Sequence, residues 1–353
     1  METIQYKCPN CGGELQYKAD KQKFGCDYCL SEFTDEEIKQ IFSETENTDL
    51  SQNVDETVED DGFSNGNLYS CSSCGAEIMS DGNTAATFCV YCHCPVILKG
   101  RLSGDYRPNK VIPFKITREQ ALETFKSTIG KKKFTPTDFK SDQTLEKMTG
   151  LYVPFWLADC KVKADMDAVG KHIRTWTSGD YKYKETKEYS VRRSADITFK
   201  GVPADGASKI DDSLMDAVEP FDYSKVEDFS MSYLSGYLAD RYDVNKGDVF
   251  PRIRQKVDKG SRSLLMDSIT GYDDVSVSHF NNNIMSTKWS YALLPVWFMT
   301  YKYNGKMYEF AVNGQTGKLV GNPPLSIKKL IAFGIGLAVV IAVLFGIGGS
   351  LLS

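Results

Sequence analysis

The pattern of apolar and polar positions divides the chain into three parts. The last stretch, residues 330–352, is apolar throughout and carries no charge. Residues 101–325 combine apolar positions at helical spacing with the alternation that is typical of strands. The first 100 residues contain paired cysteines and no comparable apolar run. The predicted fold class is α+β, with two tandem small ribbons, a larger mixed domain and one C-terminal helix.

The C-terminal apolar stretch predicts a transmembrane helix. At about 1.5 Å per residue its 23 residues extend roughly 34 Å, and a hydrocarbon core is about 30 Å thick. Lys328 and Lys329 precede it, and lysines beside a span stay cytoplasmic. We therefore expect an anchor at 327–352 in the cell membrane, with the bulk of the chain cytoplasmic. The alternative is a buried core helix, which the length and the absence of charge disfavour.

Small residues recur at every fourth position of this stretch. They are Gly334, Ala338, Ala342, Gly346 and Ser350. Such a stripe lets two helices approach closely, which predicts a homo-oligomer through the transmembrane helix. The alternative is that glycine and alanine are simply common in membrane helices.

Residues 101–325 are expected to form the larger mixed α+β domain. Polar and apolar residues alternate over 161–168, after a Val-Pro-Phe-Trp motif at 153–156, and indicate a half-buried strand. A Leu-Pro-Val-Trp motif at 294–297 echoes the first, so the domain is expected to contain two related halves. Asn304-Gly305 predicts a hairpin between strands.

Helices are expected at three places in this domain. Thr117 and Gln120 have the spacing of a capping box for a helix that Gly130 ends. A short helix is expected within 141–149, and further helices within 211–265. Their apolar stripes indicate core packing.

Four cysteines near the N-terminus form two Cys-x-x-Cys pairs. They are Cys8, Cys11, Cys26 and Cys29. Four thiolates from two such turns complete a tetrahedron around Zn²⁺. A segment this short cannot bury enough apolar surface to fold alone, and metal binding, on the order of 10–16 kcal/mol, supplies the missing stability. We expect a zinc ribbon at 1–44, with a short capped helix; chance spacing or a redox cysteine pair is the alternative.

The same cysteine spacing recurs 63 residues later. The second set is Cys71, Cys74, Cys89 and Cys92. Tyr28 recurs as Tyr91 in the same register. A second ribbon is therefore expected at 67–100, giving two structural Zn²⁺ ions in all. His93 or Cys94 are alternative ligands, but the repeat favours Cys92. Four thiolates leave no open coordination position, so the predicted sites are structural rather than hydrolytic.

Charge is unevenly distributed along the chain. Residues 1–66 contain 5 Lys/Arg and 16 Asp/Glu, a net charge of −11, whereas residues 67–353 carry +6. The acidic segment 45–66 is expected to be a flexible linker between the ribbons. An acidic N-terminal part is repelled by DNA, which disfavours nucleic acid as a partner.

No sequence pattern indicates an enzyme. A Gly-x-x-x-x-Gly-Lys-Ser/Thr phosphate loop is absent, and the three histidines fit no catalytic triad or metalloprotease pattern. We therefore expect no catalytic residue and no cofactor besides zinc.

The first cysteine motif (6–13), its copy (69–75), the two Pro-x-Trp motifs and an Asn-Gly-Gln-Thr-Gly-Lys run at 313–318 together resemble a bacterial family. That family is described as TFIIB-type zinc-ribbon proteins, and also as primosomal-helicase-like or phage replication proteins. Its members in Gram-positive bacteria are similar to membrane proteins encoded beside phage-shock-type and SPFH-type, virion-core-like proteins. The resemblance implies a membrane-stress scaffold that recruits such partners.

The expected function is a non-enzymatic, tail-anchored membrane adaptor. Its cytosolic zinc ribbons and α+β domain would recruit protein partners at the lipid bilayer. Two alternatives remain open: a membrane-associated nucleic-acid-binding protein that uses the second ribbon, and a zinc-thiolate redox sensor whose oxidation ejects the metal.

Overall fold

The computed structural model describes most of the chain. The described residues are 8–11, 13, 15–46, 67–71, 74–80, 89–91, 96–101, 108–234 and 236–351. The expected linker at 45–66 lies outside them except for its first two residues, and so do Cys92, His93 and Cys94. Side chains of the C-terminal helix are described as far as Ile341.

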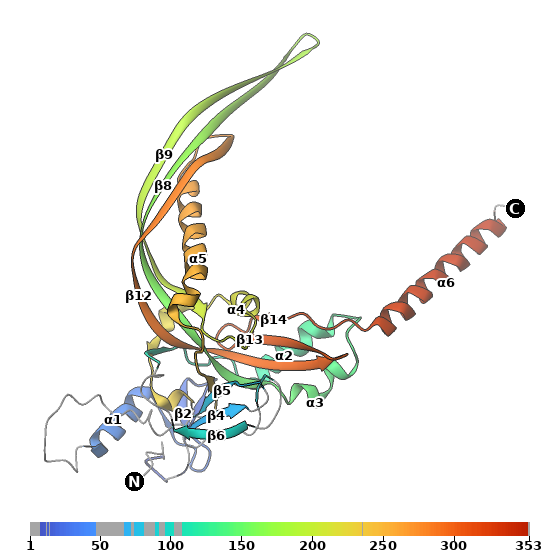
Figure 1. The fold of residues 1–353 in the computed structure, drawn as a ribbon. Coiled ribbons are helices and arrows are strands. Elements are labelled where there is room, and N and C mark those ends of the chain that lie inside the picture. Colours follow the sequence, from blue (N-terminus) through green and yellow to red (C-terminus); the bar gives the residue numbers. More distant parts are fainter. Residues whose placement is uncertain are drawn as a thin grey trace.

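The described residues form fourteen strands, six α-helices and three short 3-10 helices, which Figure 1 labels in part. In chain order they are β1 (Leu15–Lys18), β2 (Lys23–Cys26), β3 (Glu32–Phe33), α1 (Asp35–Glu46), β4 (Asn67–Cys71), β5 (Glu77–Ser80), β6 (Val96–Arg101), β7 (Lys110–Val111), α2 (Arg118–Gly130), η3 (Asp138–Lys140), α3 (Asp142–Leu145), β8 (Thr149–Ser178), β9 (Tyr181–Asp205), α4 (Asp212–Val218), η4 (Tyr223–Lys225), β10 (Glu227–Asp228), η5 (Met231–Leu234), β11 (Leu238–Asp240), α5 (Lys246–Asp267), β12 (Asp274–Tyr303), β13 (Lys306–Asn313), β14 (Leu319–Val320) and α6 (Ile327–Leu351). The mixed α+β class is confirmed.

Three long antiparallel strands form a curved ribbon that rises from the body (Figure 1). β8 lies in the middle and pairs with β9 along one edge and with β12 along the other. Even-numbered side chains of β8 from Ala158 to Ala168 are buried, whereas the lysines and aspartates at odd positions from Lys161 to Asp167 are not. The half-buried strand expected from the period-two pattern is therefore confirmed.

The two Pro-x-Trp motifs begin opposite each other in this sheet and run in opposite directions. Val153 pairs with Leu294, and Pro154 with Leu293, in the antiparallel register of β8 and β12. Both tryptophans donate their indole N–H to a backbone carbonyl, Trp156 at 2.9 Å and Trp297 at 2.8 Å. The motifs therefore belong to neighbouring strands at the base of one ribbon.

Helix α5 covers the concave face of the ribbon (Figure 1). Its buried side chains recur about every fourth residue, and Ile253 and Val257 pack in one cluster with Ala158 and Val162 of β8. The apolar stripe expected within 211–265 is therefore a core face. A Cβ at Gly260 would lie 2.8 Å from the Phe199 ring, so glycine permits the close approach of α5 to β9.

The predicted local signals appear where they were expected. In the capping box at α2, the Thr117 hydroxyl accepts the Gln120 N–H and the Gln120 side chain accepts the Thr117 N–H. The β12–β13 hairpin turns at Asn304 and Gly305, with φ of 49° and 78°. These positive φ angles are what the Asn-Gly signal indicates.

The two ribbons join the body differently. Strands β4, β5 and β6 extend the large eleven-stranded sheet through β11, where Ala239 pairs with Met79 and Asp240 with Ile78. The first ribbon keeps its own sheet of β1, β2 and β3. It contacts the body through the rings of Tyr17 and Phe24, which pack on Tyr233 with centroids 5.4 and 5.9 Å apart.

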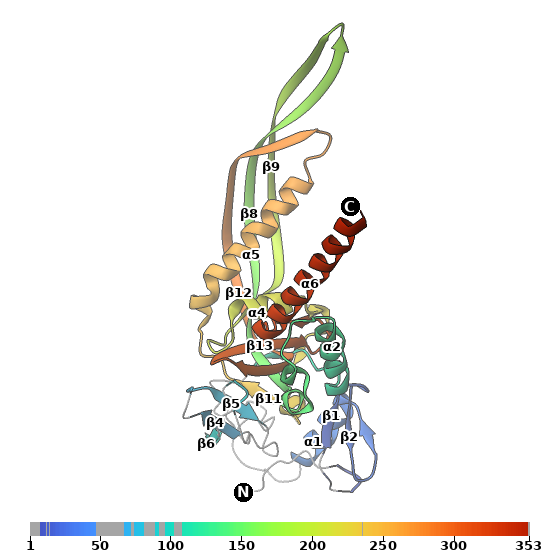
Figure 2. The same ribbon diagram turned by 90° about the vertical axis from the view of Figure 1, so that its right-hand side faces the viewer.

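Helix α6 extends away from the body at the C-terminal end (Figures 1 and 2). Its large apolar side chains from Leu330 to Ile341 are exposed. Within the part of the chain that the structure describes, no helix is both long enough and apolar enough to cross a membrane. The transmembrane helix expected at 327–352 is therefore not confirmed.

We expect the packing of α5 to dominate the stability of the long sheet formed by β8, β9 and β12. Ile253→Ala should lower the free energy of unfolding by about 2–5 kcal/mol, because it leaves a cavity against β8. Arg254→Ala, at an exposed position of the same helix, should change the free energy of unfolding by less than about 0.5 kcal/mol. Urea denaturation followed by tryptophan fluorescence measures both, since Trp156 and Trp289 border this cluster. Equal effects of the two substitutions would contradict the packing described.

Candidate metal centres and an acidic pocket

The four cysteines of the first ribbon lie together. The sulfur atoms of Cys8, Cys11, Cys26 and Cys29 are all within 4.8 Å of one another. Cys8 and Cys29 are 3.4 Å apart, and Cys11 and Cys26 3.5 Å, measured between Sγ atoms. A tetrahedral Zn²⁺ with Zn–S near 2.3 Å places its sulfurs about 3.8 Å apart. The cluster can therefore hold a metal ion, and its spacing is consistent with zinc.

The second ribbon brings together three of its four predicted ligands. The Sγ atoms of Cys71, Cys74 and Cys89 are within 4.8 Å of one another, and those of Cys74 and Cys89 are 3.6 Å apart. This cluster too can hold a metal ion. Cys92 lies outside the described residues, so the choice between Cys92, His93 and Cys94 stays a prediction.

One backbone hydrogen bond at the first cysteine is the same in both copies. The N–H of Cys8 donates to the carbonyl of Gly13, and the N–H of Cys71 donates to the carbonyl of Ala76. Gly75 has φ of 73°, which glycine adopts at no steric cost. In the first copy the Gly13 N–H points to the Cys11 sulfur at 3.4 Å, as amides do around metal-bound thiolates.

The two clusters differ in burial. Cys71 and Cys89 are buried in one core cluster with β8 and β12, whereas Cys11 and Cys29 are exposed. Contacts with Ser31, whose hydroxyl oxygen is 3.2 Å from the sulfur, lower the pKa of the Cys29 thiol to about 6. The thiolate is the form that binds metal. Cys8 and Cys26 of the first cluster are themselves buried in a core cluster that includes Tyr152 of β8 and Trp297 of β12, so metal in either cluster would stabilise packing against the body.

One repeated tyrosine has opposite surroundings in the two copies. The Tyr91 hydroxyl donates to the buried carboxylate of Asp240, and its ring packs edge-on against Phe298 with centroids 5.6 Å apart. Its counterpart Tyr28 is 81% exposed, and so is Leu30 beside it. The repeat identified the pair of tyrosines from sequence, but their different environments depend on the fold.

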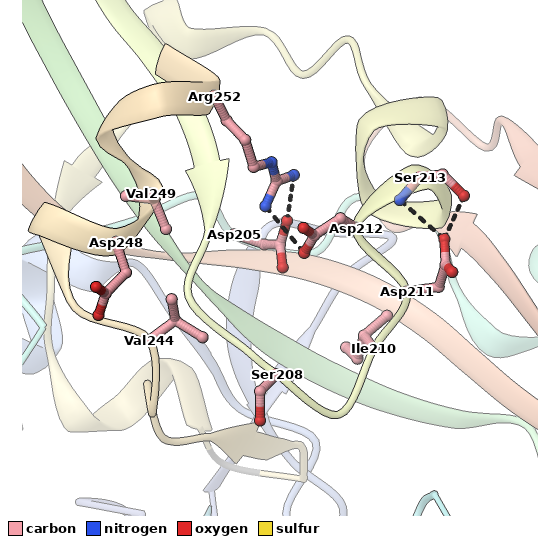
Figure 3. A pocket seen from close by; sticks show the side chains of 10 residues that line it. All are labelled: Asp205, Ser208, Ile210, Asp211, Asp212, Ser213, Val244, Asp248, Val249 and Arg252. Carbon is pink, nitrogen blue, oxygen red and sulfur yellow. Dashed lines mark hydrogen bonds and ion pairs between the residues drawn. The ribbon is translucent and has the colours of Figure 1, made fainter. Parts of the chain in front are cut away.

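Sequence reasoning missed an acidic pocket in the body. A cavity of about 560 Å³ opens between the end of β9, α4 and the start of α5 (Figure 3). Its charged lining residues are Asp205, Asp211, Asp212, Asp248 and Arg252. They come from separate segments and share no spacing, so no local motif could have indicated the pocket. Neither cysteine nor histidine lines it.

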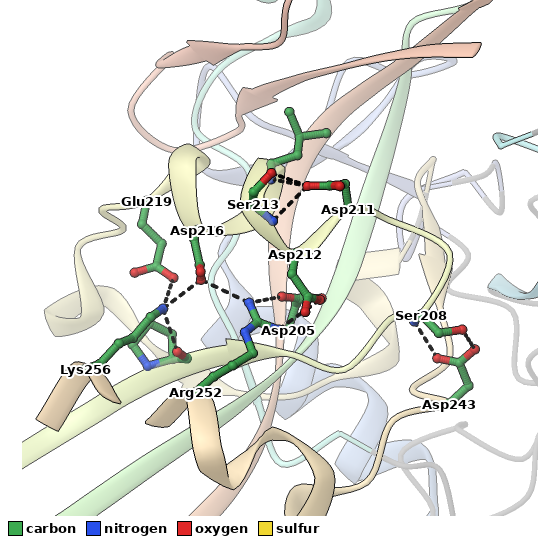
Figure 4. Close-up of polar contacts among 12 residues, drawn as sticks. Asp205, Ser208, Asp211, Asp212, Ser213, Asp216, Glu219, Asp243, Arg252 and Lys256 are labelled. Atoms are coloured by element: carbon green, nitrogen blue, oxygen red, sulfur yellow. Dashed lines mark hydrogen bonds and ion pairs between the residues drawn. The ribbon is translucent and has the colours of Figure 1, made fainter. Parts of the chain in front are cut away.

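Arg252 of α5 pairs with two of the four pocket carboxylates, and Lys256 extends the network to Asp216 and Glu219 (Figure 4). Arg252 lies within 3.0 Å of a carboxylate oxygen of Asp205, Asp212 and Asp216. Lys256 lies 2.9 Å from Asp216 and from Glu219. These ion pairs connect α5 to α4 and to the end of β9. We interpret the network as a structural clamp rather than a reaction centre.

Asp205 is the least solvated carboxylate of the network. Asp205 is 2% exposed, and its Oδ2 atom has no hydrogen-bond partner among the described residues. Burial raises the pKa of Asp205 to about 6, against the opposing effect of Arg252. The clamp therefore contains a group that changes charge in mildly acidic solution.

Comparison with known proteins gives one extensive match. The chain is 33% identical over 340 residues to the Bacillus subtilis (strain 168) "Uncharacterized protein YdjG", which covers 95% of this chain and 94% of the relative. No family model matches the chain. No solved structure matches it significantly.

We predict a pH-dependent effect of Asp205→Asn. The pKa of Asp205 is about 6 in the folded chain and ordinarily 3.8. Between these pH values the folded chain is still protonated at Asp205, whereas the unfolded chain has lost the proton. The group thus stabilises the fold below about pH 4 and loses this contribution as pH rises through about 6. The wild-type free energy of unfolding, relative to the variant, should fall by about 3 kcal/mol across that window. Urea titrations at a series of pH values measure this, and parallel profiles would contradict it.

Proposed function

We propose that this chain, which belongs to the same family as the Bacillus subtilis YdjG protein, is a non-enzymatic, tail-anchored membrane adaptor. Two structural zinc ribbons and the α+β body recruit protein partners, and α6 holds them at the cell membrane with the bulk of the chain in the cytoplasm. The resemblance to membrane-stress proteins suggests the setting in which such recruitment operates.

Zinc is the proposed metal in both clusters. The donors are thiolates at tetrahedral spacing, which Zn²⁺ prefers and Mg²⁺ or Ca²⁺ do not. Each site is closed by four protein ligands, with Cys92 completing the second. Zinc then acts by folding the ribbons, and not by activating water.

The contrast between Tyr28 and Tyr91 carries the adaptor proposal. Tyr91 docks the second ribbon on the body through a carboxylate and an aromatic ring. In the first ribbon the counterpart Tyr28 and its neighbour Leu30 face solvent instead. A partner that offers a carboxylate beside an aromatic side chain would fit this surface as Asp240 and Phe298 fit Tyr91. Tyrosine and its aliphatic neighbour are a typical interface anchor.

The exposed apolar surface of α6 supports the membrane anchor. Large apolar side chains between Leu330 and Ile341 face solvent, which costs free energy in water and is favourable in lipid. Lys328 and Lys329 stand at its body end, where they suit a cytoplasmic interface.

A zinc-thiolate redox sensor is the second candidate. It is favoured by the exposure of Cys11 and Cys29, which leaves their sulfurs open to an oxidant such as peroxide. Oxidation would eject the metal from the first ribbon before the second, because none of the described cysteines of the second cluster is exposed. Zinc release under mild peroxide distinguishes this function from the adaptor.

Cysteine substitutions should remove zinc one site at a time. The purified chain should contain about two equivalents of Zn²⁺, and Cys29→Ser and Cys89→Ser should each remove about one. Cys160→Ser is the matched control, because this buried thiol lies in β8 away from both clusters. Elemental analysis by mass spectrometry measures the zinc content, and unchanged zinc in both ligand variants would reject the sites.

Cys89→Ser should also unfold the body at a lower urea concentration than Cys29→Ser, since of these two cysteines only Cys89 lies in the core.

The adaptor proposal predicts that the exposed ribbon surface selects partners. The chain carrying Tyr28→Ser and Leu30→Asn should lose most proteins that co-purify with the wild type from detergent-solubilised membranes. Asparagine suits position 30 because φ there is 61°, a left-handed conformation. Asp20→Ser, exposed in the same ribbon, should lose none.

Quantitative mass spectrometry of the three purifications measures this. An identical partner set for all three would contradict recruitment by this surface. Binding of DNA by the full chain without any protein partner would favour the nucleic-acid alternative instead. Recovery of the chain in the soluble fraction without detergent would reject the anchor.

A further inference from the structure

The end of the β8–β9 hairpin extends beyond the rest of the sheet. β12 begins at Asp274, opposite Lys171, and α5 ends at Asp267. Past Lys171 only two strands continue, and residues 174–190 are exposed on both faces (Figure 1). A two-stranded hairpin without a covering layer is marginally stable on its own. We refer to residues 171–189 as the arm.

Aromatic side chains gather at the tip of the arm. Trp176 and Tyr183 are cross-strand partners whose rings stack with centroids 5.6 Å apart. Trp176 is 42% exposed and Tyr181, next to the turn, is 72% exposed. The Arg174 guanidinium lies 5.8 Å from the Trp176 ring centroid. The face that carries these rings is the one that α5 covers further down the ribbon.

The tip is also locally basic. Residues 174–184 contain three Lys/Arg and one Asp, a net charge of +2, in a chain whose net charge is −5. Amphipathic tryptophan and tyrosine rings beside lysine and arginine are typical of residues at a membrane–water interface. Basic side chains there attract anionic headgroups.

The arm and α6 both extend away from the body. Figure 2 shows both rising from it, whereas in Figure 1 the arm rises steeply and α6 points obliquely up and to the right. We propose that the tip of the arm, residues 174–184, contacts the headgroup region of an anionic bilayer. This is a second membrane contact, and it stands independently of whether α6 spans the membrane.

Other occupants fit the tip less well. Single-stranded nucleic acid would also stack on aromatic rings, but it needs a basic groove along its backbone. The tip is a thin ribbon in which Trp176 and Tyr183 already stack on each other. A second copy could pair with the outer edge of β9, but Lys182, Lys184 and Lys187 on that strand oppose pairing.

Tryptophan quenching tests the proposal in the full chain. The protein is reconstituted into phosphatidylcholine–phosphatidylglycerol vesicles, with and without lipids that are brominated near the headgroup. We expect bromine to quench the wild type, and Trp176→Phe to abolish the quenched component. The other three tryptophans are buried or half-buried against the packed clusters of the body, so they are less accessible to lipid than Trp176. Equal quenching of both proteins would overturn the proposal.

A second measurement separates the arm from α6. The chain with Trp176→Ser, Tyr181→Ser and Tyr183→Ser should bind added anionic vesicles roughly tenfold more weakly if α6 does not anchor it. If α6 does anchor it, flotation stays and only the Trp176-dependent quenching is lost. Leu264→Ser, exposed on α5, is the matched control and should change neither.

Two results distinguish the possible failures. Flotation through α6 without Trp176-dependent quenching rejects the arm contact and leaves the anchor intact. Trp176-dependent quenching by an oligonucleotide, with no effect of lipid, would assign the arm to nucleic acid and overturn the proposal. Circular dichroism of each variant shows that the body remains folded, since the substituted side chains lie outside its core.

Discussion

The pairing of β8 with strands on both of its edges is the interaction on which the other parts of the molecule depend. β9 and β12 each pair with β8 along most of its length. α5 packs on this sheet because β8 presents apolar side chains to it at every second residue. β11 pairs with the start of β8, and through β11 the second ribbon becomes part of the same sheet. The second metal cluster and the arm are both positioned through this one strand.

The two ribbons show how one repeated motif acquires two structural roles. In each copy the first cysteine is buried and donates its N–H to a backbone carbonyl five residues later, yet the second copy continues the large sheet whereas the first keeps its own sheet and exposes Cys11 and Cys29. Both copies contribute buried cysteines to core clusters that include residues of β8 and β12. The first copy also exposes Tyr28 and Leu30, so this surface is available for recognition.

Local signals predicted the parts of this fold that local chemistry determines. The capping box at Thr117 and the Asn304-Gly305 turn each act within a few residues, and both were predicted correctly from sequence. The cysteine spacing predicted two clusters that can hold a metal ion, while the role of Cys92 stays a prediction. The continuation of the sheet into the second ribbon depends on the pairing of Ile78 with Asp240, which no local pattern encodes. The acidic pocket was missed for the same reason, because Asp205 and Arg252 meet only after the chain has folded.

The continuity of β8 has a mechanical consequence. The strand runs without interruption from Thr149 in the core to Ser178 at the far end, and β9 accompanies it through a nearly unbroken register. A hydrogen-bonded ribbon of this length resists bending in its own plane and behaves as a lever. A force applied at the distal end would therefore exert torque on the base of the long sheet, where Pro154 lies. Displacement of that end would be transmitted to the core, far from the point where the force acts.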